Sequence, residues 1–177
     1  MAKRASATAR EIRAMLAGGD RRSIGRSNEL ADLLVQGQCR VRHAIHLLLD
    51  PDSLVRIRAA DALEKASTRN AQLIAPFRDE LVALLCEAEQ QELRWHLALM
   101  APRLGLQGPD RRRALTALRR YLTDRSSIVK TCALDAMAQF AALDPGLEPE
   151  VRELLRAAER SGTAAMRARA RKLLKDG

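Results

Sequence analysis

A cation recurs near the start of four similar apolar segments, as Arg56, Arg94, Lys130 and Arg167. The successive spacings are 38, 36 and 37 residues, so all four would occupy the same place in a repeating unit. Guanidinium and ammonium groups bind phosphate and carboxylate oxygens through charge-assisted hydrogen bonds. If the four cations faced one surface, they would form a row suited to a nucleic-acid backbone or to an acidic peptide.

Side chains beside these cations could extend the row. Trp95 could anchor a partner, although packing in the core is the favoured interpretation for so large a side chain. Asp61 and Asp135 occupy matching positions and would return negative charge to the same surface. The candidate binding residues, expected on an inner, concave surface, are Arg56, Arg58, Arg94, Trp95, His96, Lys130, Arg167 and Arg169.

The sequence gives little support to other chemistry. His43 and His46 are three residues apart, as two metal ligands on one helix could be, but no third ligand stands at a matching spacing. Cys39, Cys86 and Cys132 are too few and too dispersed for a zinc site or a disulfide framework. Neither a Gly-rich phosphate loop nor a nucleophile elbow occurs. We therefore expect no catalytic site, no metal and no cofactor.

The net charge of +9 and the pI of about 10.4 favour an anionic partner. The basic residues are concentrated at the two ends of the chain. Residues 1–26 carry seven cations and two acids, residues 27–108 nine and eleven, and residues 109–177 fifteen and nine. Aromatic residues make up only 2% of the chain, which disfavours single-strand binding by base stacking. Nucleic acid therefore remains a possible partner, and a protein partner is preferred.

The densest basic run is RRRALTALRRYL, which begins at Arg111. Its leucines form one helical stripe, which places Arg112 with Arg119 and Arg113 with Arg120 on another side. On the first helix of a hairpin that side would face outward, so we expect a solvated charged surface.

The elements that must position these residues are helices. Val55, Ala59 and Leu63 recur at helical spacing, and each such segment follows a second amphipathic segment. The pattern predicts one all-α domain, a right-handed α-solenoid of about five helical hairpins. The hairpins are expected at residues 39–68, 70–105, 109–143 and 146–176. The second helix of an N-terminal capping hairpin is expected at 19–38. Residues 1–18 form either the first helix of that hairpin or a loosely ordered segment. No apolar run approaches the roughly 20 residues that span a bilayer, so we expect a cytoplasmic protein without a membrane partner, monomeric by default.

The stretch DPDSLVRIRAADALEKA, residues 50–66, resembles the HEAT repeat, in which Asp-Pro-Asp lies in the turn and Val-Arg opens the second helix. The segments GDRRSIGRSNEL, EQQELRWHLALM, DRSSIVKTCALDAM and MRARARKLLK are similar to those of small prokaryotic HEAT-repeat proteins. The resemblance covers nearly the whole chain after about Gly19. It is specific for the fold and implies no activity.

The resemblance also implies a structural role for the repeated cation. HEAT proteins commonly pair the turn aspartate with the arginine four residues later, and Asp52 with Arg56 matches that pattern. The other copies lack an acid at that position, but Glu89 and Asp124 stand close enough in sequence to substitute. A ladder of ion pairs is favoured over a ligand-facing row, and both remain open.

Three classes of function are compatible with such a fold. A scaffold that binds another protein needs only a repeat surface, and we favour it. HEAT-like alkylpurine DNA glycosylases place an acid among aromatic side chains, which Asp61 and Asp135 lack nearby in sequence. HEAT-like bilin lyases need a tetrapyrrole cleft and di-iron hydroxylases need paired His-Glu motifs, and no His-Glu dipeptide occurs. We therefore predict a non-catalytic protein, with nucleic-acid binding as the alternative.

Overall fold

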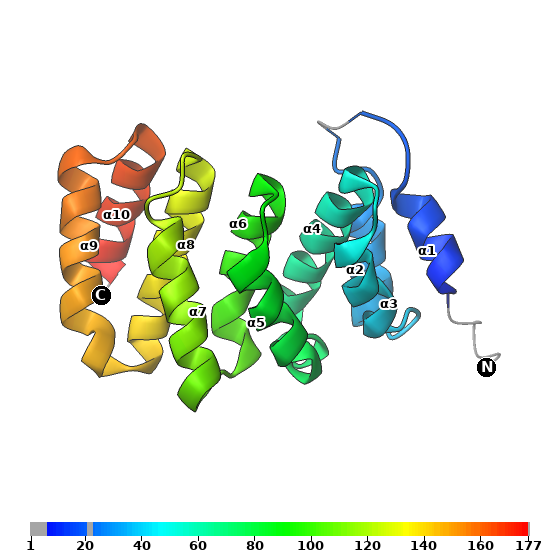
Figure 1. Ribbon diagram of the computed structural model, residues 1–177, viewed down its shortest axis with the longest axis horizontal. Coiled ribbons are helices and arrows are strands. Elements are labelled where there is room, and N and C mark those ends of the chain that lie inside the picture. Colours follow the sequence, from blue (N-terminus) through cyan, green and yellow to red (C-terminus); the bar gives the residue numbers. More distant parts are fainter. Residues whose placement is uncertain (1–6, 21–22, 177) are drawn as a thin grey trace. The chain divides into compact units, whose positions relative to one another are not determined.

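The computed structural model describes residues 7–20 and 23–176, and this part of the chain is built from helices (Figure 1). The α-helices are α1 (Ala9–Leu16), α2 (Ser27–Val35), α3 (Val41–His46), α4 (Ser53–Arg69), α5 (Arg78–Glu87), α6 (Gln91–Met100), α7 (Gly108–Tyr121), α8 (Ser127–Leu143), α9 (Glu148–Ser161) and α10 (Ala164–Asp176). Short 3₁₀ helices join several of them, and the described residues form no strand beyond an isolated bridge between Ala7 and Cys39. The predicted all-α solenoid fold is confirmed. None of the described helices is long and apolar enough to cross a membrane.

The helices can be compared with the expected hairpin ranges. To within one residue at an edge, each of the four ranges holds two consecutive helices, α3 with α4, α5 with α6, α7 with α8, and α9 with α10. At the N-terminus, helix α1 occupies part of the range left open between a helix and a loosely ordered segment. A capping box at Thr8 and Glu11 starts this helix, and Ile12 and Leu16 are fully buried. Residues 1–6 lie outside the described part.

The chain forms two compact units. Unit 1 comprises Met1–Glu80 with Arg103–Gly105, and unit 2 comprises Leu81–Pro102 with Leu106–Gly177. In unit 1, α1, α2 and α3 all pack against α4. Within unit 1, the Arg103 guanidinium donates to the Glu64 carboxylate at 2.9 Å and to Ser67 Oγ at 3.0 Å. That the chain is a single domain stays a prediction.

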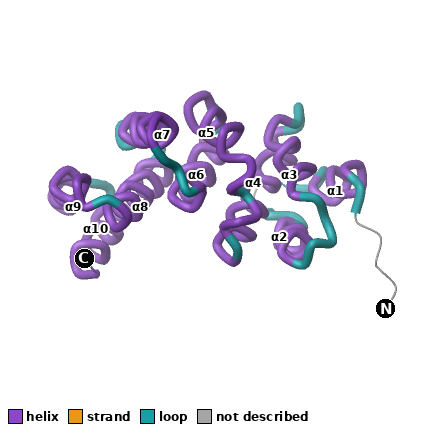
Figure 2. Tube along the Cα trace, turned by 90° about the horizontal axis from the view of Figure 1, so that it is seen from below, coloured by secondary structure: helices purple, strands orange, loops and turns teal. Residues whose placement is uncertain are grey.

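Unit 2 has two layers of helices. The first helices of its hairpins, α5, α7 and α9, lie on one side, and the second helices, α6, α8 and α10, lie on the other (Figure 2). The second helices pack consecutively, α6 on α8 and α8 on α10. The core contains leucines from both layers, all nearly inaccessible to solvent: Leu85, Leu97, Leu118, Leu134 and Leu155.

Polar side chains cap the starts of three second helices. Asp52 Oδ1 accepts the Leu54 N–H at 2.9 Å, and hydroxyls of Ser126 and Thr163 accept first-turn N–H groups of α8 and α10, each at 3.4 Å. Pro102 follows the end of α6 and does not kink that helix. Helix α6 continues regularly to Met100, and Pro102 lies in the 3₁₀ helix Ala101–Leu104. Proline has no backbone N–H to donate, and the change from α to 3₁₀ helix at the end of α6 accommodates this missing donor.

Candidate functional site

The four repeated cations occupy the same register of their helices. Arg56, Arg94, Lys130 and Arg167 are each the fourth residue of α4, α6, α8 and α10. In every case the backbone N–H of the cation donates to the carbonyl of the residue just before its helix, at 2.8 to 3.1 Å. A cation here lies near the positive end of the helix dipole, so an acceptor close to its side chain is favourable. The equivalent repeat position of these residues was therefore predicted from the sequence. Their role depends on which groups their side chains contact.

Arg94 forms the clearest step of an ion-pair ladder. Its guanidinium lies 2.9 Å from a carboxylate oxygen of Asp124, which belongs to the turn before the next second helix. The Asp124 side chain is only 5% exposed, and its Oδ1 also accepts the Ser126 N–H at 2.7 Å. This contact joins α6 to the following hairpin, as the ladder interpretation allowed. The pair lines a polar hollow of about 580 Å³ that also includes Glu87 and Glu89.

Arg56 and Arg167 direct their side chains toward turn carbonyls. Arg56 Nη1 donates to the carbonyl oxygens of Asp50 at 2.6 Å and Pro51 at 3.1 Å, while Arg167 Nη1 donates to that of Gly162 at 2.8 Å. Both cations thereby hold the turn that precedes their own helix. Asp52, the partner that the HEAT resemblance implied for Arg56, uses its Oδ1 to cap α4 as described above.

Lys130 differs from the other three. Its side chain is half-buried at the start of α8, and its ammonium has no hydrogen bond or ion pair within residues 7–20 and 23–176. The Lys130 ammonium can therefore donate to an anionic or carbonyl group of a partner without breaking a hydrogen bond within the chain.

Arg58 was proposed as a binding residue, but the structure buries it. The residue is 2% exposed, and its guanidinium donates to four backbone carbonyls. The acceptors are Leu16 at 2.7 Å, Gly18 at 2.6 Å, Asp20 at 2.9 Å and Ser23 at 3.2 Å. Two residues along a helix turn the side chain by about 200°, so Arg58 points to the side of α4 opposite Arg56. It holds the connection between α1 and α2 and is not available to a ligand.

The remaining candidates lie in unit 2. His96 is 8% exposed, which also removes it from the surface, whereas Trp95 is half-buried with its ring centroid 5.6 Å from that of His96. Arg169 Nε donates to Asp135 at 2.7 Å, and Gln139 donates to the other oxygen of the same carboxylate at 3.0 Å. Arg169 therefore joins α10 to α8, and Asp135 is neutralised within the layer.

Six of the candidates thus lie on the second helices of unit 2, and apart from the buried His96 they have two roles. Trp95 and Lys130 are partly exposed, so an aromatic ring and an ammonium group are available to a partner. Arg94, Arg167 and Arg169 instead bind groups of their own chain. We call the surface formed by α6, α8 and α10 the second-helix surface. Arg56 and Arg58 belong to unit 1.

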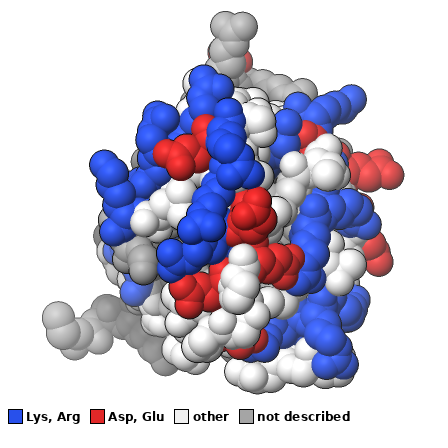
Figure 3. All heavy atoms as spheres, turned by 90° about the vertical axis from the view of Figure 1, so that its left-hand side faces the viewer, with Lys and Arg blue, Asp and Glu red and all other residues white. Residues whose placement is uncertain are grey.

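Figure 3 shows the face of the molecule that includes the C-terminal hairpin. Lys and Arg form bands on this face, separated by Asp, Glu and uncharged residues. On α10 the exposed cations include Arg171, Lys172 and Lys175. The positive charge expected from the sequence is therefore interrupted by acids instead of forming a continuous patch.

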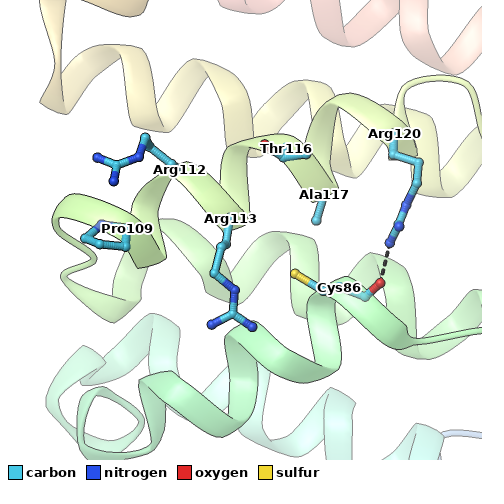
Figure 4. A pocket seen from close by; sticks show the side chains of 7 residues that line it. All are labelled: Cys86, Pro109, Arg112, Arg113, Thr116, Ala117 and Arg120. Atoms are coloured by element: carbon cyan, nitrogen blue, oxygen red, sulfur yellow. Dashed lines mark hydrogen bonds between the residues drawn. The ribbon is translucent and has the colours of Figure 1, made fainter.

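Sequence reasoning also missed a groove between α5 and α7 in unit 2 (Figure 4). It has a volume of about 420 Å³, and arginines from the run at 111–120 line it. The run was expected to be a simple solvated surface. Its signal in the sequence was the seven-residue spacing of Arg113 and Arg120, but the neighbouring helix that closes the groove could not be inferred from that spacing.

Comparisons with known proteins identify the fold and no family. No protein-family model and no curated protein matches the chain. A computationally designed armadillo repeat protein for modular peptide recognition is similar in structure, with a TM-score of 0.63 and 17% identity, over 93% of this chain and 80% of that one. An engineered protein is similar over 95% of this chain and 78% of its own, with a TM-score of 0.61 and 19% identity. These similarities support a helical repeat fold.

Proposed function

We propose that the protein is a non-catalytic helical-repeat scaffold that binds a segment of another protein on the second-helix surface of unit 2. The observation that carries the proposal is the balance of charge on that surface. Arg94 is paired with Asp124 and Arg169 with Asp135, while Lys130 and Trp95 offer a cation and an apolar ring to a partner. A protein segment supplies complementary groups of both kinds.

The same balance weighs against nucleic acid as the main partner. Binding to a phosphate backbone gains affinity from each phosphate that a free cation neutralises. An arginine already paired with a carboxylate must give up that pair to contribute. Aromatic side chains for base stacking are also scarce, at 2% of the sequence. The repeated cations therefore favour a protein partner.

The similarity to a designed armadillo protein for peptide recognition agrees with this choice. Repeat folds provide an extended surface in which equivalent positions recur along the stack. Trp95, Thr131 and Ala168 occupy one such set, immediately after the repeated cation of α6, α8 and α10. A bound segment that follows the three helices would meet a large, a medium and a small side chain in turn, which can select its sequence.

A crosslinking experiment tests the proposal. A photo-crosslinking amino acid at Ala168, exposed on α10, should capture a protein in cells of the source organism. The same residue at Arg156, exposed on the first helix α9, should not capture that protein. Nuclease treatment before capture should leave the crosslink unchanged.

The captured protein is then purified and titrated against two variants. Lys130→Glu should weaken binding at least tenfold, about 1.4 kcal/mol, because it places a like charge or an unmatched acid against the partner. The matched variant Arg156→Glu carries the same change of charge and should stay within twofold. Equal weakening by both variants, or none by Lys130→Glu, would refute the assignment of the surface.

The second candidate function is nucleic-acid binding, favoured by the exposed cations of α10 and by the bands of Lys and Arg in Figure 3. Weak, non-specific binding to duplex DNA at low salt is expected from them, and it should vanish near physiological salt. Sequence-selective binding to DNA that persists at physiological salt and is lost in Lys130→Glu would make nucleic acid the primary partner.

A further inference from the structure

The arginines of α7 fall into two groups according to the neighbour they face. Toward the following hairpin, Arg119 forms a two-pronged contact with Glu150, at 2.6 and 2.7 Å, and Arg111 pairs with Asp144. These two guanidiniums are neutralised by acids of the same chain. The other group faces the groove between α5 and α7, and no acid lines that groove.

Three arginines of this second group, Arg112, Arg113 and Arg120, line the groove with most of their hydrogen-bond donors unused. Arg112 makes no hydrogen bond or ion pair with any described residue, and Arg113 has one long contact of 3.4 Å with Asp110. One N–H group of Arg120 donates a hydrogen bond to the Cys86 carbonyl oxygen, shown as a dashed line in Figure 4. Because a guanidinium has five N–H donors, each can bind a carboxylate without losing an internal ion pair of normal length.

The geometry of the groove limits what can bind. Figure 4 shows Arg113 and Arg120 extending from α7 toward α5, whereas Arg112 points away from Cys86. Arg113 and Arg120 are seven residues apart on one helix, so their Cα atoms are about 10 Å apart. Between them the lining is small and largely apolar, formed by Thr116, Ala117 and Cys86. The groove therefore has two cationic ends and an uncharged middle.

We propose that this groove binds an acidic segment of a partner protein in the polyproline II conformation. This left-handed helix has three residues per turn and rises about 9 Å over them, so side chains three residues apart project from the same side. Two acidic side chains flanking two small apolar residues therefore match the two arginines and the middle. Each carboxylate can accept a two-pronged contact from its arginine. The site is separate from the second-helix surface, because it lies on the first helices of unit 2.

Tyr121 keeps the two sides of the groove together. Its buried hydroxyl donates to the Leu85 carbonyl at 2.6 Å, which ties the end of α7 to α5 next to Cys86. Burial raises the pKa of this phenol, so it stays a neutral donor at physiological pH. The groove is therefore formed before a ligand arrives, which lowers the cost of ordering it on binding.

Two fluorescein-labelled peptides with the same composition test the proposal with the intact protein. In the first, glutamates flank two small apolar residues, and in the second, the glutamates are contiguous. Fluorescence anisotropy at physiological salt should show at least fivefold tighter binding of the first peptide. The variant Arg113→Gln/Arg120→Gln should lose at least tenfold in affinity. The matched variant Arg156→Gln/Arg160→Gln removes two exposed arginines of α9 and should change the affinity less than twofold.

Alkylation of cysteine provides a second readout that reports the location. Cys86 is in the groove and Cys132 is on α8, and both are half-buried. The first peptide should slow the reaction of Cys86 with iodoacetamide and leave Cys132 unchanged. Lys130→Glu, which tests the second-helix surface, should leave peptide binding intact, so the two proposals can fail independently.

The possible results are distinct. Preference for spaced glutamates, loss in the groove variant alone and protection of Cys86 would support the proposal. Absence of binding, equal loss in both double variants, or no protection of Cys86 would overturn it. A single-stranded oligonucleotide that binds more tightly than the peptide and protects Cys86 would overturn the assignment of a protein segment as the ligand.

Discussion

Arg58 should be one of the main sources of stability in unit 1. We predict that Arg58→Met, which keeps the aliphatic stem and removes the donors, lowers the free energy of unfolding by about 3 kcal/mol. One of the four lost bonds, to the Leu16 carbonyl, is fully buried, and a buried bond from a charged donor contributes about 1.5 to 3 kcal/mol. The other three acceptors lie at the partly exposed connection. Because water can replace those bonds, each contributes about 0.5 kcal/mol, and relief of guanidinium desolvation offsets part of the total.

Urea unfolding followed by circular dichroism measures this change, and hydrogen exchange locates it. The amides near Gly18 and Gly25 should exchange faster in Arg58→Met, whereas those of α8 should not change. Gly25 provides an internal check because it has φ of +55° and a Cβ there would lie 2.8 Å from Arg58 Nε. Gly25→Ala should therefore destabilise the wild type more than it destabilises Arg58→Met. A loss below about 1 kcal/mol in Arg58→Met, or full additivity with Gly25→Ala, would contradict the structural role.

Three further predictions concern the core and the ion pairs. Leu63→Ala should cost about 2 to 5 kcal/mol in urea unfolding, because Leu63 is fully buried and its loss leaves a cavity; a neutral result would contradict the packing. Arg94→Ala should cost about 1 to 3 kcal/mol, since it leaves the 5% exposed Asp124 carboxylate without its cation, and Arg94→Ala/Asp124→Asn should recover part of the loss. The Arg13 guanidinium lowers the pKa of Asp50, so this pair stabilises the fold above the ordinary carboxyl pKa of about 4 and the stabilisation is lost as pH falls through the lowered value. A pH series of melting temperatures should therefore show a shallower acid decline in Arg13→Gln, and identical profiles would refute the linkage.

The repeating fold could be predicted from the sequence because it depends on local patterns. Apolar residues at helical spacing, such as Val55, Ala59 and Leu63, define a buried stripe wherever the helix packs. The caps at Asp52 and Ser126 are local as well, because a capping side chain acts on its own first turn. These features need only neighbours in the chain, so the helical hairpins and the equivalent register of the four cations followed from the sequence.

The candidate site could be predicted only in part. Position in the repeat placed Arg56, Arg94, Lys130 and Arg167 near the start of the second helices, and in the structure each is the fourth residue of its helix. It did not distinguish Arg58 from Arg56, because the opposite side of α4 becomes buried only when α1 and α2 pack against it. The buried side of a helix depends on its neighbours as well as on its own pattern.

The sequence by itself determined which segments are helices, where they begin and which residues recur in equivalent positions. The tertiary structure decided what each cation does. Arg94 pairs with Asp124, 30 residues later in the chain, and Arg119 pairs with Glu150, 31 residues later. Lys130 and Arg113 retain unused hydrogen-bond donors. The physical reason is that the charge state of a surface depends on distances of a few ångströms between side chains that no local pattern fixes. The second-helix surface and the α7 groove therefore became visible only after the hairpins had packed.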